Sequence, residues 1–219
     1  KDFVKNYMKT KFGKIKKPDE KKHAERIEQF RSEGMKTTRP DGDCYFHAIR
    51  FLIKRTYGIE IGVDECRLLI IRMIRNLIDT DENFRESIRL EAMNDQIGNE
   101  NDYLAYMSQS GSWAGEPEII ATCALFNCVI IIKTSRYDDD NMIIPNKIYT
   151  NSFPKYKNID NSIYQYQHVW TLYHVGIISD HYNYSKHIFS TELNLPLDFK
   201  LPNIRLGVYN IKEYTRTFL

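Results

Sequence analysis

The succession of hydrophobic patterns along this chain constrains its fold most strongly. Up to about Phe126, apolar residues recur mainly at the spacing of amphipathic helices. We expect these helices at residues 18–30, 44–57, 64–78, 81–94, 103–107 and 117–126. The apolar run at 128–132 is β-branched and too short for a helix, so it predicts a central strand, and further strands are expected at 146–149 and 168–178. Helices that precede strands favour an α+β fold, with a small central β-sheet flanked by helices, over an alternating parallel sheet.

The helix expected at 64–78 divides into two faces. Its spacing places four apolar side chains on the inward face, which are Leu68, Ile71, Ile74 and Ile78. Three arginines fall on the outward face, which are Arg67, Arg72 and Arg75. We therefore expect the arginines of this helix to face the solvent.

The composition suits one globular domain with appendages. Of 219 residues, 42% are hydrophobic, which excludes a disordered tail or a collagen-like rod. Residues 1–39 hold 13 Lys and Arg against 6 Asp and Glu, whereas the rest hold 18 against 23. We divide the chain into a basic N-terminal arm and helix at 1–36, a main domain at 37–184, and a C-terminal extension at 185–219 packed on or beside that domain. The arm is expected to be a solvated extension, and contact with nucleic acid is the less favoured alternative.

The cysteines and the hydropathy indicate the compartment. The four cysteines, at 44, 66, 123 and 128, form no Cys-x-x-Cys pair and are too few for a disulfide scaffold. This pattern predicts free thiols in a reducing, cytoplasmic compartment, without a metal site. No signal-peptide core and no run near the roughly 18 apolar residues of a membrane span is present, so no membrane association is expected. We expect a monomeric domain cut from a longer protein.

Cys44 is the candidate nucleophile, because it stands at the first turn of an expected helix, directly after the turn formers Asp41, Gly42 and Asp43. Unpaired amides and the positive end of the helix dipole favour a thiolate there. The amides of Gly42, Asp43 and Cys44 can also hold an oxyanion, and Gly42 lets the backbone come close. The side chain of Asp43 is expected to cap the helix. The alternative is that Cys44 packs as a small buried residue.

A thiolate nucleophile needs a general base, and six histidines compete for this role. His181 is the best candidate, because it ends an expected strand and Asn183 projects to the same side of that strand. The carboxamide of Asn183 can accept a hydrogen bond from one ring nitrogen and leave the other facing the thiol. The remaining histidines are expected to be solvated, structural or directed away from the thiol, and these are His23, His47, His168, His174 and His187.

Three segments resemble the ovarian-tumour-type (OTU) cysteine deubiquitinases, in the order in which that family has them. Residues 41–48, Asp-Gly-Asp-Cys-Tyr-Phe-His-Ala, resemble its Asp-Gly-x-Cys nucleophile box. Residues 113–119, Trp-Ala-Gly-Glu-Pro-Glu-Ile, resemble its Trp-Gly-Gly-x-x-Glu-aliphatic segment, with Ala114 in place of the usual Gly. Residues 181–183, His-Tyr-Asn, resemble its His-aromatic-Asp/Asn terminus. The resemblance covers roughly 37–184 and implies a papain-like α+β cysteine protease fold.

The resemblance implies roles for individual residues. Cys44 would be the nucleophile, His181 the general base and then acid, and Asn183 the residue that orients His181. Asp41 is a second candidate for the orienting role, or for shaping the oxyanion turn. The amide of Asn183 stands where the family more commonly has Asp, and an amide stabilises the imidazolium less than a carboxylate does.

The same resemblance implies a substrate and a reaction. Trp113 and Tyr182 would line the substrate cleft, and a position in the core is the alternative for Trp113. The implied reaction is hydrolysis of the isopeptide bond between a ubiquitin C-terminus and a substrate lysine, through a thioester on Cys44. No metal or organic cofactor is expected. Ubiquitin and its conjugates are the expected partners, and a ubiquitin-like modifier is a second candidate.

The alternative function is a non-catalytic ubiquitin-binding module with the same fold. Against this alternative, a site that has lost catalysis has no physical need to keep Cys44, His181 and Asn183 together. A composition rich in Lys, Asn, Ile and Tyr suits an AT-rich genome, and the resembling family occurs in eukaryotes, viruses and intracellular bacteria. We therefore favour a viral or pathogen effector that acts in the host cytoplasm.

Overall fold

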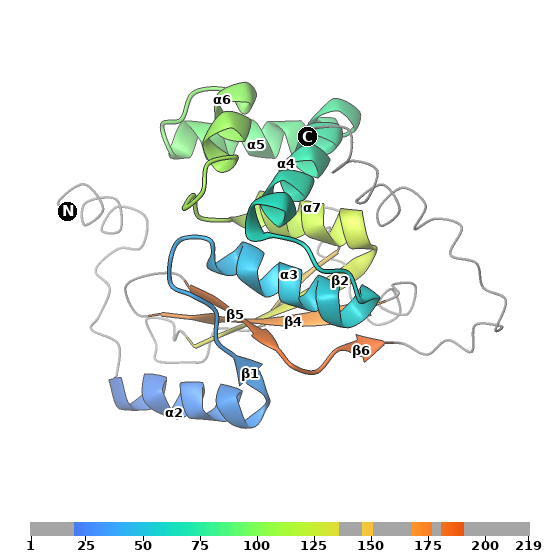
Figure 1. Cartoon of the computed structure of the whole chain (residues 1–219). Coiled ribbons are helices and arrows are strands. Elements are labelled where there is room, and N and C mark those ends of the chain that lie inside the picture. The colour runs from blue at the N-terminus through green and yellow to red at the C-terminus, as the bar shows by residue number, and fades with distance from the viewer. Residues whose placement is uncertain (1–19, 136–145, 151–167, 177–180, 191–219) are drawn as a thin grey trace, which may run out of the picture.

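A mixed β-sheet separates one helix on its lower face from a larger group of helices on its upper face (Figure 1). The computed structural model describes residues 20–135, 146–150, 168–176 and 181–190. The prediction of an α+β fold with a small sheet flanked by helices is confirmed. None of the described helices has the length and apolarity that crossing a bilayer requires.

The sheet contains both parallel and antiparallel strand pairs. Its described strands are β1 (Met35–Lys36), β2 (Cys128–Thr134), β3 (Lys147–Tyr149), β4 (His168–Val175), β5 (His181–Ser185) and β6 (Phe189–Ser190). They lie in the order β1-β5-β4-β2-β3, with β6 also paired to β4. β2 runs parallel to β4, and the other described pairs are antiparallel. The apolar run at 128–132 therefore occupies an interior strand, as expected from its composition.

Every helix expected from the spacing of apolar residues is present within the described residues. These helices are α2 (Glu20–Ser32), α3 (Cys44–Tyr57), α4 (Val63–Thr80), α5 (Glu82–Asn94), α6 (Glu100–Met107) and α7 (Glu116–Phe126). The start of α6 differs most, because the Asn99 side chain accepts from the backbone N–H groups of Asn101 and Asp102 and begins the helix before Tyr103. α3 and α7 lie on the sheet, and α4, α5 and α6 lie beyond them (Figure 1).

Part of the main core lies between α3 and the sheet. Phe46, Ile49 and Leu52 of α3 are completely buried, as are Trp170 and Leu172 of β4. Their burial removes enough apolar surface from water to fix the orientation of α3 on the sheet. The N-terminal end of α3, which carries Cys44, is thereby held near β5.

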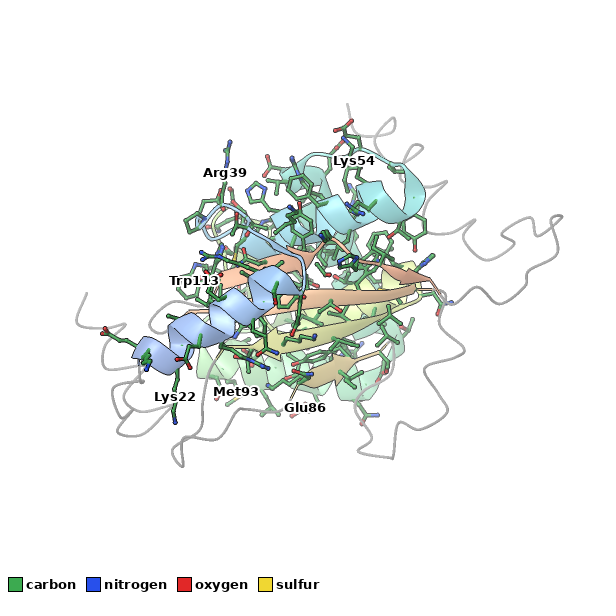
Figure 2. The ribbon with its side chains drawn as sticks, turned by 90° about the horizontal axis from the view of Figure 1, so that it is seen from below. Lys22, Arg39, Lys54, Glu86, Met93 and Trp113 are labelled. Atoms are coloured by element: carbon green, nitrogen blue, oxygen red, sulfur yellow. The ribbon has the colours of Figure 1, made fainter. Side chains whose placement is uncertain are left out.

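The segment expected to form the basic arm contributes to the lower layer. α2 crosses the lower face of the sheet (Figure 2), and its Phe30 ring lies 4.8 Å from the ring of Tyr173, centroid to centroid. β1 pairs with β5 at the edge of the sheet. The lysine-rich residues 1–19, and the tail from 191 onwards that was expected to pack on the domain, lie outside the described residues.

The predicted faces of α4 are wrong at two neighbouring positions. Arg67, expected to face solvent, is 1% exposed, whereas Leu68, expected to face the core, is 44% exposed. Ile71 and Ile74 are buried as expected. Arg67 is buried because its guanidinium donates to Asp43 and to two backbone carbonyls from other segments. Helical spacing cannot reveal partners of this kind, because they are distant in sequence.

The strand assignment around His181 also needs correction. β4 ends at Val175, and His181 is the first residue of the separate strand β5 instead of the last residue of a longer one. The two strands pair antiparallel, with Tyr182 opposite His174 and Asn183 opposite Tyr173. The expected alternation of side chains still applies to His181 and Asn183, because both lie in β5.

A buried carboxyl group fixes the start of α7. Glu118 is completely buried; its Oε2 accepts from the Gly115 N–H at 2.7 Å and its Oε1 accepts from the Tyr103 hydroxyl at 2.9 Å. Burial raises the pKa of Glu118 to about 6, although these two hydrogen bonds oppose that shift. Glu118 thereby connects α6 to the loop that precedes α7.

Stability should depend on pH through Glu118. Because its pKa in the folded state lies above the ordinary value of 4.5, folding favours the protonated form, and that contribution disappears as the pH rises through about 6. A shift of this size corresponds to about 2 kcal/mol. Urea unfolding measures the difference in the free energy of unfolding between the wild type and Glu118→Gln. We expect this difference to fall by about that amount from pH 4 to pH 7. A difference that is independent of pH would contradict this assignment.

Candidate active site

Cys44 lies at the first residue of α3, beside the start of β5. Its Sγ accepts a hydrogen bond from the backbone N–H of Tyr182 at 3.4 Å. The following residues, Tyr45 and Phe46, anchor the first turn of α3 in the core. Tyr182 follows His181 directly, so the structure brings the predicted nucleophile beside the strand that carries the predicted base.

The local electrostatics favour the protonated form of Cys44. Burial raises the pKa of this thiol, while N–H groups of Tyr182 and Tyr45 oppose the shift and the negative charge of Asp41 adds to it. This net direction is opposite to the one expected from the position at a helix N-terminus. The direction differs because the thiol is buried against β5 as well as placed at the N-terminus of α3, and burial has the larger effect on its pKa.

His181 is half-buried, and one ring nitrogen has a defined partner. Its Nε2 lies 3.3 Å from the hydroxyl oxygen of Thr38, and that hydroxyl lies 2.6 Å from the carbonyl oxygen of Tyr182. A carbonyl only accepts, so the hydroxyl donates to Tyr182 and accepts from His181. This arrangement assigns the proton to Nε2 and leaves the lone pair on Nδ1.

Asn183 is buried directly beneath this contact. Its Oδ1 accepts from the backbone N–H of Thr38 at 2.9 Å, and its Nδ2 lies 3.6 Å from the Sδ of Met35. Burial lowers the pKa of His181, while hydrogen bonds with Asn183 and Thr38 oppose the shift. Together with the raised pKa of Cys44, this makes a neutral thiol and a neutral imidazole the favoured resting pair.

Thr38 is a site residue that the sequence analysis missed. It contacts His181 through its hydroxyl and Asn183 through its amide. Its neighbour Thr37 belongs to the same stretch of turn-forming residues. No local pattern distinguishes the two threonines, because the partners of Thr38 lie more than 140 residues away along the chain.

Asp41 shapes the turn before α3. Its Oδ1 accepts from the Asp43 N–H at 3.1 Å, and its Oδ2 lies 3.0 Å from Nε2 of His47. His47, expected to point away from the N-terminal end of the helix, therefore reaches back to that turn. Both carboxylate oxygens of Asp41 thus have partners at the start of α3, whereas Asn183 and Thr38 are bonded to His181.

Gly42 and Asp43 each have a distinct structural role. Gly42 has a φ of +81°, and a Cβ on it would lie 2.5 Å from the carbonyl oxygen of Gly111, so only glycine fits there. The Asp43 side chain makes no capping hydrogen bond to α3, contrary to expectation. It instead accepts from Arg67, from the hydroxyl of Ser110 and from the Gly111 N–H. Its own N–H, one of the three expected oxyanion donors, is occupied by Asp41.

The two expected substrate contacts differ in exposure. Trp113 is 56% exposed, so it is not a core residue, and Figure 2 shows it at the edge of the molecule, on the same side of the view as Arg39. Tyr182 is half-buried, with its ring centroid 5.4 Å from that of Tyr45 and 5.0 Å from that of His174. The side chain of Trp113 is therefore largely open to solvent, whereas that of Tyr182 joins β5 to α3 and β4.

Other histidines with described contacts have structural surroundings. The ring of His168 packs edge-on against Tyr57, and burial lowers its pKa. His23, expected to be solvated, is half-buried with Nδ1 3.4 Å from the carbonyl oxygen of Ser135. Among the described residues, no group of three or more His, Cys, Asp or Glu side chains could hold a metal ion.

Comparisons with solved structures find several OTU domains, whereas a search of curated proteins finds no match. The chain is similar to the OTU domain of OTUD1, with 19% identity, coverage of 77% of this chain and 93% of that chain, and a TM-score of 0.45. It is similar to the viral OTU domain protease from Dera Ghazi Khan virus, with 17% identity, coverage of 71% and 81%, and a TM-score of 0.46. It is also similar to an OTU deubiquitinase from Wolbachia pipientis wMel bound to ubiquitin, with 13% identity, coverage of 71% and 94%, and a TM-score of 0.48.

A family model gives the assignment. The model described as OTU-like cysteine protease matches residues 39–182, about two thirds of the chain. The matched range contains Cys44, Trp113 and His181 and stops one residue before Asn183. The chain therefore belongs to the OTU-like cysteine protease family and has the α+β fold of its members.

Proposed function

We propose that this chain is a deubiquitinating cysteine protease that hydrolyses the isopeptide bond at the ubiquitin C-terminus. One observation carries the proposal: the Sγ of Cys44 meets the backbone of β5 at Tyr182, next to His181, whose Nε2 is already held by Thr38. Membership of a cysteine protease family supports the reaction type. The resemblance of three motifs to OTU deubiquitinases supports ubiquitin as the substrate.

The neutral resting pair defines the first step. Nδ1 of His181 accepts the proton of the Cys44 thiol as Sγ attacks the carbonyl carbon of the last ubiquitin residue. Negative charge then develops on the carbonyl oxygen, and we assign the N–H groups of Gly42 and Cys44 as its donors, because the Asp43 N–H is occupied by Asp41. The imidazolium donates its proton to the leaving lysine nitrogen, which leaves a thioester on Cys44. Water hydrolyses this thioester with His181 again as the base, which releases the ubiquitin carboxylate.

Asn183 and Thr38 orient His181 throughout this cycle. With the Nε2 proton directed to the Thr38 hydroxyl, Nδ1 remains available to the thiol at the start of each half-reaction. Asn183 holds the backbone of Thr38 in place, and it also bonds to His181. An amide and a hydroxyl stabilise the imidazolium less than a carboxylate does, so their main contribution is orientation.

We propose residues 37–184 as the catalytic unit, with α2 and β1 as its support and a ubiquitin-like modifier as a second substrate. The exposed Trp113 is assigned to the substrate cleft. Cys44 and the other cysteines at 66, 123 and 128 are free thiols, which suits a reducing cytoplasm. A ubiquitin-binding module without catalysis is the alternative function.

A ubiquitin probe with a C-terminal electrophile distinguishes these two functions. We expect the wild type to form a covalent adduct, Cys44→Ala to form none, and Cys66→Ala to react normally, because the thiol of Cys66, a residue of α4, is buried in the core. Intact-mass spectrometry measures the adduct. No adduct with wild type that still binds ubiquitin would favour the non-catalytic module, whereas an adduct that survives Cys44→Ala would show that another residue is the nucleophile.

The choice of base is tested by comparing two imidazoles that lie close to the site. His181→Ala should lower kcat on the order of 10² to 10⁴-fold, because the proton of Cys44 loses its acceptor. His174→Ala should cost only a few-fold, because His174 packs against the ring of Tyr182. Steady-state kinetics with a fluorogenic ubiquitin C-terminal amide measures both. Equal losses in the two variants would show that His181 was wrongly chosen.

The role of the Thr38 hydroxyl can be isolated because its backbone amide performs a separate task. Thr38→Val keeps the N–H that donates to Asn183 and removes only the hydroxyl at Nε2 of His181. We expect kcat to fall about tenfold with little change in KM, the size of one lost hydrogen bond to a charged group. Thr38→Ser should restore most of the rate in the same kinetic assay. No rescue by serine would show that the hydroxyl does not orient His181.

A further inference from the structure

A buried ion pair lies behind the turn that carries the nucleophile. Arg67 of α4 donates to the carboxylate of Asp43, and both side chains are almost completely buried. Asp43 immediately precedes Cys44, so the pair contacts the active-site turn from the side opposite to the solvent. The mechanism proposed above uses neither of these two side chains.

Arg67 connects four parts of the fold. Its Nη1 donates to the Met107 carbonyl at the end of α6 at 2.8 Å, and its Nη2 donates to the Ser112 carbonyl at 2.9 Å and to Asp43. The guanidinium also lies 3.9 Å from the ring centroid of Phe46 in α3. A planar guanidinium holds several acceptors in fixed directions, and a lysine ammonium cannot reproduce that geometry.

Asp43 binds the same loop from the other side. Its carboxylate accepts from the Ser110 hydroxyl at 2.8 Å and from the Gly111 N–H at 3.1 Å. Burial raises the pKa of Asp43, but hydrogen bonds with Arg67, Gly111 and Ser110 outweigh it and lower the pKa overall, so the carboxyl group is ionised. The backbone of residues 107–112 is thus held on both sides: Arg67 donates to its carbonyl groups, and Asp43 accepts from an N–H group.

The loop at 107–112 in turn supports the nucleophile turn. A Cβ on Gly42 would lie 2.5 Å from the Gly111 carbonyl oxygen and 2.9 Å from the Gly111 Cα, so the two backbones are in direct contact. Gly111 is itself exposed, and therefore no burial of its own holds it there. Hydrogen bonds hold the loop in this place: those with Asp43 and Arg67, and the one that the Ser112 hydroxyl donates to the Tyr106 carbonyl at 2.8 Å.

We propose that Arg67 and Asp43 are positioning residues that hold the loop at 107–112 against Gly42. They thereby fix the turn at residues 41–43, which precedes Cys44. The effect on catalysis rests on the proposed function, whereas the anchoring of the loop does not. Replacing a buried ion pair by apolar residues is often neutral for stability, so stability alone does not explain this pair. Its geometric role follows from the carbonyl oxygens of Met107 and Ser112 and the N–H group of Gly111, which it holds within the loop at 107–112.

Two mild substitutions test the proposal without leaving either buried charge unpaired. Ser110→Ala removes one donor from Asp43, and Arg67→Lys keeps the charge but loses the planar fork. With a fluorogenic ubiquitin C-terminal amide we expect kcat to fall about tenfold in Arg67→Lys and several-fold in Ser110→Ala, with KM within about twofold. Ser110→Thr, which keeps the hydroxyl, should restore the rate. Arg75→Met, at an exposed position of α4, is the matched control and should behave as wild type.

Hydrogen–deuterium exchange measures how firmly the loop at 107–112 and the turn before Cys44 are held, and it does not require ubiquitin. We expect peptides that cover 39–44 and 107–113 to exchange faster in Arg67→Lys and Ser110→Ala than in the wild type or Arg75→Met, while peptides of β4 stay protected. Unchanged exchange in both variants would overturn the anchoring. Faster exchange with unchanged kcat, or a loss of thermal stability without a loss of kcat, would overturn the effect on catalysis. An inactive wild type would refute the proposed function, and the exchange data alone would then decide on the anchor.

Discussion

The antiparallel pairing of β5 with β4 is the constraint on which the candidate site depends. It places Tyr182 opposite His174 and turns the rings of Tyr182 and Tyr184 towards α3, where they meet Tyr45 and Phe51. These aromatic contacts bind the strand to the helix that begins at Cys44. As a result, a backbone N–H of β5 reaches a thiol 138 residues away in the chain.

Burial shifts the pKa values of the candidate nucleophile Cys44 and the candidate base His181 in opposite directions. It raises the pKa of Cys44 and lowers that of His181, because both shifts remove a charge from a poorly solvated place. Hydrogen bonds from Tyr182 to the thiol, and between His181 and both Thr38 and Asn183, partly oppose these shifts. Both shifts favour the neutral forms of the thiol and the imidazole.

Buried charged groups join the loops around this site to the helices. Glu118 holds Gly115 and Tyr103, and the pair of Asp43 and Arg67 holds the chain between α6 and Trp113. Each carboxylate accepts from a backbone N–H group of a loop, Gly115 for Glu118 and Gly111 for Asp43, and so helps to fix the position of that loop. The two systems support the start and the end of the connection between α6 and α7.

The sequence by itself determined the described helices, the strands β2, β3 and β4, the place of Cys44 at a helix start, and the spacing of His181 and Asn183 on one strand. These features follow from patterns within a few consecutive residues, which local backbone geometry imposes. Only the tertiary structure decided that Arg67 is buried, that Thr38 contacts His181, and that burial raises the pKa of the Cys44 thiol. Those properties depend on partners 24 to 145 residues apart and on burial between packed elements, and neither leaves a periodic trace in the chain.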